Sequence, residues 1–94
     1  MDEHTAIHLA NLFSALSDPS RVRILDLLFT RELSVGAIAQ QLGMSESAVS
    51  HQLHDLRIQR IVRARKVGRQ VFYCLDDEHV AELFSMGLKH MEHF

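Results

Sequence analysis

The sequence predicts a mainly α-helical fold with one β-hairpin near its C-terminal end. Residues 5–58 carry apolar side chains at helical spacing, divided into four segments by residues typical of helix ends. Residues 61–75 change to short β-prone runs, and helical spacing returns over residues 77–93. With 94 residues and 47% hydrophobic content, the chain is expected to form a single domain, 1–94, around one core.

The first two predicted helices are separated by a strong start signal. Apolar residues in the segment 5–16 recur at mostly helical spacing. Asp18 then precedes Pro19, which is the arrangement of an N-cap followed by proline at the first helical position. The helix that begins there is predicted to run to about Phe29, and residues 31–33 are predicted to connect it to the next helix.

Two further helices, at residues 35–42 and 46–58, form a candidate helix-turn-helix over 35–58. Ser34 and Ser45 are the expected N-caps, and Gly43 follows the shorter helix where a C-terminal glycine is common. The apolar positions of the longer helix step by four and by three residues, so one face is expected to pack inward: Val49, Leu53 and Leu56.

The runs 61–65 and 70–75 predict two strands, with the basic segment 66–69 at the turn. A basic hairpin directly after a helix-turn-helix is typical of a wing. We therefore predict a winged helix-turn-helix fold with its wing over residues 61–75.

Charge is unevenly distributed along the chain. The net charge is −2, yet the segment 45–73 carries +4 and the remainder carries −6. A local basic surface attracts DNA phosphates, although a solvated basic face would give the same pattern. Charge alone leaves both interpretations open.

The helix-turn-helix and the wing together favour double-stranded operator DNA as the partner. Small hydroxyl, amide and imidazole groups at the start of the longer helix suit the major groove. These candidates are Ser45, Ser47, Ser50, His51, Gln52 and His54. In the wing, the candidates for contacts to the DNA backbone or minor groove are Arg63, Arg65, Lys66 and Arg69.

The last predicted helix, residues 77–93, carries potential metal ligands at both ends. Asp77 and His79 lie at its start, and His90 and His93 lie one turn apart at its end. The offset of 11 residues from His79 to His90 corresponds to a rise of about 16 Å, whereas metal–nitrogen bonds are about 2 Å long. One helix therefore cannot join both pairs around one ion.

Two antiparallel copies of this helix would bring the pairs together. Facing positions in such a pair have residue numbers with a constant sum, and 79 with 90 and 77 with 93 share that sum to within one residue. The pattern predicts a homodimer with two equivalent metal sites. The alternative interpretation is a set of unrelated surface histidines.

Three imidazoles and one carboxylate suit Zn²⁺ in tetrahedral coordination, and Co²⁺ can mimic it. Ni²⁺ is the main alternative, because it prefers six ligands. His4 and His8 are four residues apart and share a helical face, so they are the candidates for additional nickel ligands.

These features together resemble the ArsR/SmtB family of metal-responsive winged-helix repressors. The resemblance spans nearly the whole chain and rests on the last-helix ligand pattern and on three motifs: LSDPSRVRIL at 16–25, ELSVGAIA at 32–39 and SESAVSHQL at 45–53. It implies a dimeric repressor that binds DNA without metal and is released when zinc or cobalt binds between the C-terminal helices.

The chain departs from one pattern of the family. Members that sense soft metals carry a Cys-x-Cys pair in the first helix of the helix-turn-helix, where this chain has Ser34 and Gly36. Thiolate ligation of a soft metal is therefore not expected there. Cys74 stands alone and is expected to be a small packing residue.

Other classes of protein fit the sequence less well. Four protein ligands leave no open position on a metal, and no nucleophile motif is present, so an enzyme is not expected. Two alternatives remain open. In one, zinc only stabilises the dimer, and in the other, the chain is a DNA-binding protein that responds to no ligand. The absence of an 18-residue apolar run and of a signal peptide, with the lone Cys74, predicts a cytoplasmic protein without a membrane segment.

Overall fold

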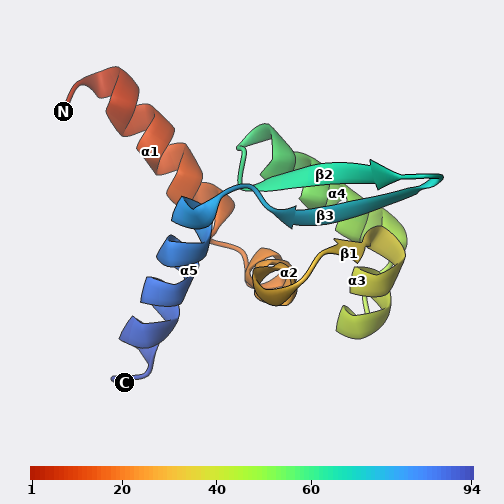
Figure 1. Cartoon of the computed structure of the whole chain (residues 1–94). Helices are drawn as coiled ribbons and strands as arrows, with labels where there is room; N and C mark the ends of the chain where they lie inside the picture. Colours follow the sequence, from red (N-terminus) through yellow and green to blue (C-terminus); the bar gives the residue numbers. More distant parts are fainter.

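A computed structural model describes residues 1–94 as five helices and three strands (Figure 1). In chain order these are α1 (Glu3–Ala15), α2 (Pro19–Thr30), β1 (Leu33–Ser34), α3 (Val35–Leu42), α4 (Glu46–Ile58), β2 (Val62–Val67), β3 (Gln70–Leu75) and α5 (Glu78–Met91). The predicted bounds of α3 and α4 are confirmed. The first helix begins two residues earlier than predicted, and the last one is shorter than 77–93 at both ends.

Side-chain caps explain where the helices start. In each of the five helices, an oxygen of the N-cap side chain accepts a hydrogen bond from the backbone N–H three residues on. The predicted caps Asp18, Ser34 and Ser45 are confirmed, and Asp77 caps α5. The additional cap is Asp2, which accounts for the early start of α1.

The sheet has three strands in the order β1-β3-β2, and all pairs are antiparallel. β2 and β3 form the predicted wing, with Gly68 at φ 62° in the two-residue turn between them. Strand β1 begins at Leu33, the last residue of the segment predicted as a connection, and there Leu33 pairs with Tyr73. The predicted turn 66–69 was too long, because Lys66 and Val67 belong to β2.

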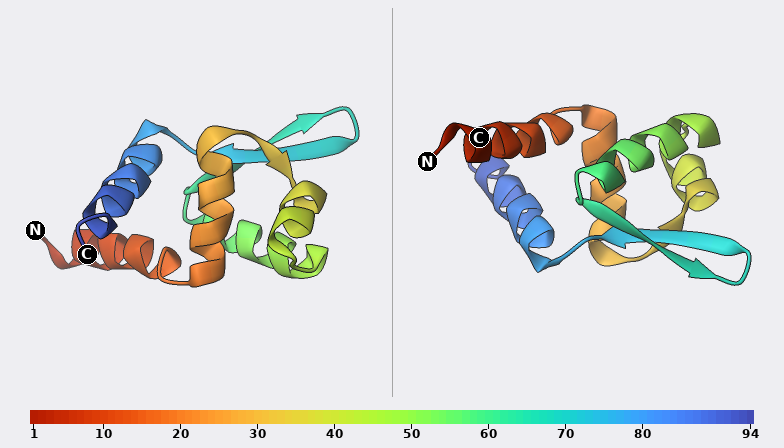
Figure 2. Two further views of the ribbon diagram at one scale, coloured as in Figure 1. Left: turned by 90° about the horizontal axis from the view of Figure 1, so that it is seen from below. Right: turned by 90° about the horizontal axis from the view of Figure 1, so that it is seen from above.

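The apolar core lies in residues 19–75, which comprise α2, β1, α3, α4, β2 and β3 and are termed the head. Ten of the eleven buried residues are in the head, and the eleventh is Ala15. Helices α1 and α5 lie together on one side of α2, and α3, α4 and the wing lie on the other (Figure 2). No residue of α5 is buried. None of the helices combines the length and apolar character needed to cross a bilayer.

Candidate nucleic-acid interface and metal centre

The helix-turn-helix is held in place by the core of the head. Gly43 ends α3 in the left-handed conformation, at φ 67°, which a residue with a side chain adopts only under strain. Val49, Leu53 and Leu56 of α4 are completely buried, as their spacing predicted. The opposite face of α4 is therefore fixed toward solvent.

The exposed face of α4 carries five of the six residues predicted to contact DNA. Ser45, Ser47, Ser50, His51 and His54 are all exposed. The hydroxyl of Ser45 accepts a hydrogen bond from the N–H of Ala48, so it also serves as the helix cap. This face presents small polar groups close to the backbone, which suits close approach to a DNA groove.

Gln52 is placed differently from the other five. Its side-chain oxygen accepts a hydrogen bond from Arg21 Nε, and its side-chain nitrogen donates to the hydroxyl of Ser20 at 3.0 Å. The amide is thus engaged with α2, and Gln52 is only half-exposed. Its partners are 31 and 32 residues away in the sequence, so local spacing gave no sign of this contact.

The four basic candidates of the wing fall into two groups. Arg65 forms a two-armed ion pair with Glu32, with Nε 3.1 Å from Oε2, and Arg63 Nε lies 3.2 Å from Cys74 Sγ. The hydrogen bond from Arg65 lowers the pKa of Glu32, and the same contact raises the pKa of Arg65. Lys66 and Arg69 have no carboxylate within ion-pair distance and are exposed.

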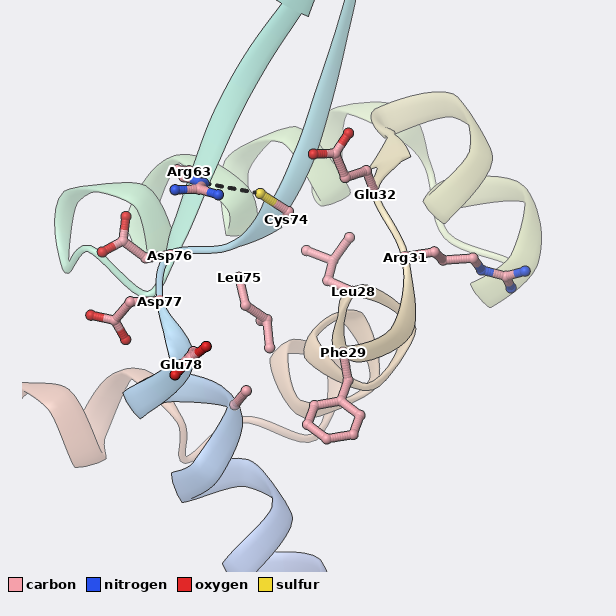
Figure 3. Close-up of a pocket in the computed structure, with 11 residues that line it drawn as sticks. Leu28, Phe29, Arg31, Glu32, Arg63, Cys74, Leu75, Asp76, Asp77 and Glu78 are labelled. Carbon is pink, nitrogen blue, oxygen red and sulfur yellow. Dashed lines mark hydrogen bonds between the residues drawn. The ribbon is translucent and has the colours of Figure 1, made fainter.

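The pair Arg63–Cys74 borders a hollow of about 550 Å³ at the base of the wing, between β3, the start of α5 and the end of α2 (Figure 3). Cys74 is half-buried there, opposite Arg63 in the strand register. Glu32, Asp76 and Asp77 line the same hollow. Two of the predicted DNA contacts, Arg63 and Arg65, are therefore already engaged within the wing base.

The first pair of potential metal ligands lies at the start of α5. Asp77 Oδ1 accepts the capping hydrogen bond from Val80 N at 3.0 Å, and Asp77 Oδ2 lies 3.6 Å from His79 Nδ1. Chiefly because of the backbone hydrogen bond, the pKa of Asp77 is lowered, so the carboxylate is charged at neutral pH. The His79 side chain is 90% exposed, and both residues are therefore accessible to a second chain.

The second pair lies at the opposite end of α5. His90 is in the helix, with its ring edge-on to Phe94 at a centroid distance of 5.3 Å. His93 lies just past the last helical residue, in a turn where its N–H donates to the carbonyl of His90. Both are exposed. With 14 residues, α5 separates the two pairs by most of its length of about 20 Å.

Within one chain, no three histidine, cysteine or carboxylate side chains gather closely enough to hold a metal ion. The chemistry of the four donors nevertheless fits Zn²⁺ or Co²⁺, since one is an ionised carboxylate and three are accessible imidazoles. His4 and His8, the additional candidates for nickel, lie on α1 with ring centroids 4.4 Å apart.

An apolar groove of about 390 Å³ runs between α5 and the helices α1 and α2. Phe13, Leu88 and Met91 line it, and their exposed fractions are 53%, 45% and 61%. His90 lines the same groove. One chain therefore leaves a continuous apolar surface uncovered next to a predicted metal ligand.

Comparison with known proteins identifies the family of the chain. Residues 18–64 match the model of the bacterial regulatory protein, arsR family. The transcriptional repressor SmtB homolog of a Synechocystis species is 48% identical over 87 residues, which are 93% of this chain and 66% of that protein. The regulator NmtR of Mycobacterium tuberculosis is 41% identical, over 99% of this chain and 78% of that protein. The chain thus spans just under two thirds of the Synechocystis relative.

The fold also matches solved structures. The homodimeric winged helix-turn-helix DNA-binding domain of Mb0332 from Mycobacterium bovis superposes with a TM-score of 0.89 at 33% identity, over 98% of this chain and 87% of that one. The predicted winged helix-turn-helix is thereby confirmed. The relatives are transcriptional regulators and not enzymes. The family match over half of the chain and the identity to these regulators establish that the chain belongs to the ArsR family.

Proposed function

We propose that the chain is a metal-sensing transcriptional repressor, which binds operator DNA as a dimer without metal and is released by zinc or cobalt. One observation carries this proposal. Four potential metal ligands lie at the two ends of the exposed, amphipathic α5, and antiparallel pairing of two α5 helices would bring them together. The same chain carries a preformed helix-turn-helix. The relatives described as a transcriptional repressor and as HTH-type regulators support it.

DNA binding is assigned to α4 and to the tip of the wing. The exposed hydroxyl and imidazole groups of α4 are available to the major groove. Lys66 and Arg69, which have no ion-pair partner, are the strongest candidates for phosphate contacts. For Arg65 to contact DNA, its ion pair with Glu32 would have to open at least in part. For Gln52 to contact DNA, its hydrogen bonds to Arg21 and Ser20 of α2 would have to break.

The dimer is assigned to α1 and α5. A second copy would cover the apolar groove and would place Asp77 and His79 of one chain beside His90 and His93 of the other. A bound zinc or cobalt ion would supply four-coordinate ligation across the two chains. The four side chains would then fix the relative position of the two α5 helices, and with it the separation of the two heads.

Linkage between the sites follows from this placement. Half-sites on DNA lie at fixed spacing, so a dimer binds well only when its two heads match that spacing. If the metal-bound arrangement fits the spacing poorly, metal weakens DNA binding, and DNA weakens metal binding by the same factor. The direction of the effect, in which metal relieves repression, is the one that the resemblance to the ArsR/SmtB family implies.

A nickel-sensing repressor is the second candidate. The two imidazoles of His4 and His8, with centroids 4.4 Å apart on α1, are a further donor pair on the dimer side of the molecule. They would complete a six-coordinate site if the start of α1 approached the α5 pair.

A cobalt(II) titration of the metal-free protein distinguishes the two candidates. Intense visible absorption that saturates at one ion per chain is expected for a tetrahedral site, and weak bands at the same ratio would favour six ligands and nickel. The titration is repeated with fluorescein-labelled operator DNA, where loss of anisotropy at the same stoichiometry is expected. Cobalt binding without DNA release would contradict the sensing function. The variants His4→Ala and His8→Ala test whether these two histidines are the additional nickel ligands.

A further inference from the structure

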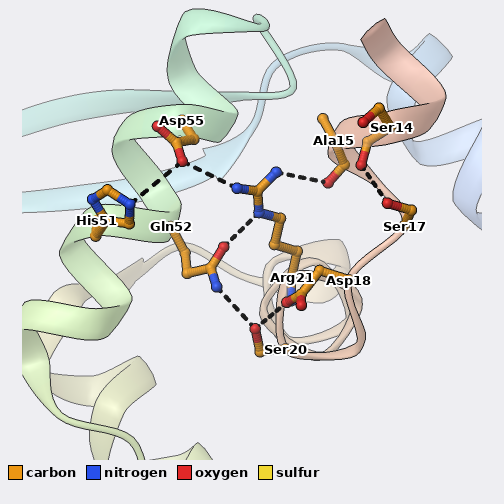
Figure 4. A network of polar contacts seen from close by, with 9 residues as sticks. All are labelled: Ser14, Ala15, Ser17, Asp18, Ser20, Arg21, His51, Gln52 and Asp55. Carbon is orange, nitrogen blue, oxygen red and sulfur yellow. Dashed lines mark hydrogen bonds and ion pairs between the residues drawn. The ribbon is translucent and has the colours of Figure 1, made fainter. Parts of the chain in front are cut away.

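Arg21 is the centre of a polar network that joins three helices (Figure 4). From its position near the start of α2, its Nη2 donates to Asp55 of α4 at 3.0 Å, and its Nη1 lies 3.4 Å from the carbonyl oxygen of Ala15, the last residue of α1. Its Nε donates to Gln52 of α4. One side chain thus contacts the end of α1 and the middle of α4 at the same time.

The groups around Arg21 are themselves fixed. Asp18 caps α2 by accepting from the N–H of Arg21 at 3.1 Å, and it also accepts from the hydroxyl of Ser20. Ser20 in turn accepts from the amide of Gln52. These hydrogen bonds form a ring that returns to Arg21, and the Arg21 side chain is only 22% exposed. The donors of a planar guanidinium point in fixed directions, so these hydrogen bonds fix the orientation of the neighbouring helices. Apolar packing is not directional and does not fix orientation in this way.

The network lies beside the face of α4 that is proposed to bind DNA. Asp55 Oδ2, which receives the Arg21 bond, is also 3.7 Å from Nε2 of the exposed His51. Between α1 and the C-terminal part of α4 there is a hollow of about 220 Å³, lined by Ser14, Arg21 and Asp55 among others. The two helices are therefore connected across the hollow by Arg21.

We propose that Arg21 is a positioning residue that sets the angle between α1 and the recognition helix α4. In a dimer built on α1 and α5, this angle determines how far apart the two recognition helices lie. The inference about the angle stands on the contacts within one chain, and its consequence for DNA rests on the proposed function.

The test uses Arg21→Lys, which keeps the charge and the aliphatic stem but removes the fork of donors. Arg23→Lys is the matched control, since Arg23 is exposed on the same helix and has no side-chain partner. Hydrogen exchange of the free protein is expected to become at least about tenfold faster in the last turn of α1 and in residues 50–56 for Arg21→Lys, because hydrogen bonds to charged groups are lost. Exchange in α3 should not change.

The second measurement is the affinity for operators whose half-site spacing is varied by single base pairs. The wild type and Arg23→Lys are expected to bind most tightly at one spacing. Arg21→Lys should bind about tenfold more weakly at that spacing, and its affinity should differ less between spacings. If Arg21→Lys does not fold, Asp55→Asn removes one arm of the network and should give the same pattern more weakly.

Two outcomes would overturn the proposal: unchanged exchange in both α1 and α4, or faster exchange with an unchanged spacing preference. If the wild type binds no operator of any spacing, the proposed function is wrong, and the exchange measurement alone then decides whether Arg21 positions α4.

Discussion

The head and the pair α1 and α5 bury their apolar side chains in opposite ways. The head contains ten of the eleven buried residues, whereas α5 contains none and α1 only Ala15. Yet α5 is strongly amphipathic in sequence, and Phe13, Leu88 and Met91 stay largely exposed around its groove. The core of the head is therefore complete within one chain, whereas the pair α1 and α5 leaves exposed the apolar surface that the proposed dimer would cover.

The largest expected effect is a loss of stability in the head. Leu53→Ala removes a completely buried side chain of α4 and should lower the free energy of unfolding by about 2–5 kcal/mol, because it leaves a cavity. Denaturant unfolding measures the loss. Leu88→Ala on the half-exposed face of α5 is the matched control at high protein dilution, and an equal loss there would contradict the distinction between the two regions.

A charge in the groove should separate the chains without unfolding them. Leu88→Lys places an ammonium group in the apolar surface assigned to the dimer, and the dimer dissociation constant should rise by about 100-fold or more. Sedimentation equilibrium measures the constant, and circular dichroism checks the head. Ile58→Lys, an exposed apolar position of α4, should leave the dimer intact. A dimer unaffected by Leu88→Lys would place the interface elsewhere.

His90→Ala should separate the two functions of the chain. The variant loses one proposed ligand, so zinc affinity should fall by about 100-fold or more, while the dimer and metal-free DNA binding persist. Anisotropy of labelled operator with and without zinc measures the response. Release of DNA by zinc at the wild-type concentration would show that His90 is not a ligand.

The wing should show a graded response to charge removal. Lys66→Ala is expected to reduce the slope of log affinity against log salt by about 1, because one phosphate contact is lost. Arg65→Ala should change the slope less, because Arg65 is paired with Glu32. Salt titrations of operator binding compare the two. Equal changes in slope would mean that the ion pair opens fully on DNA.

The smallest expected effect is on acid stability. The pKa of Glu32 is lowered by its hydrogen bond to Arg65, so the pair contributes stability above the unfolded-state pKa and loses it as pH falls through the folded-state value. For Glu32 this range lies below about pH 4.3. Glu32→Gln should flatten the acid limb of a stability–pH profile slightly. A profile unchanged between the variant and the wild type would show that the exposed pair contributes nothing.

Helix positions could be predicted from the sequence because their signals are local. Asp18, Ser34 and Ser45 mark helix starts through contacts only three residues away. The two-residue strand β1 was missed because it is too short to show alternation, and only its pairing with Tyr73 defines it. The engagement of Gln52 by Arg21 and of Arg65 by Glu32 spans 31 and 33 residues, so it required the folded chain.

The position of each candidate metal ligand along the helix could likewise be predicted from the sequence. The spacing of Asp77, His79, His90 and His93 placed the two donor pairs at the two ends of one helix, and they are found there. Whether the pairs meet depends on a second chain, and the union of the two pairs stays a prediction.

The capping bond of Asp77 has a consequence for the entropy of the proposed metal binding. Oδ1 accepts a hydrogen bond from the N–H of Val80, so the carboxylate is oriented as soon as α5 folds, and Oδ2 is left as the proposed ligand atom. His93, past the end of the helix, has no comparable restraint on its ring. Ordering that imidazole costs conformational freedom at the moment of binding. The two ends of α5 are thus unequally preorganised, and stiffening the C-terminal turn is the change that would tighten metal binding without adding a ligand.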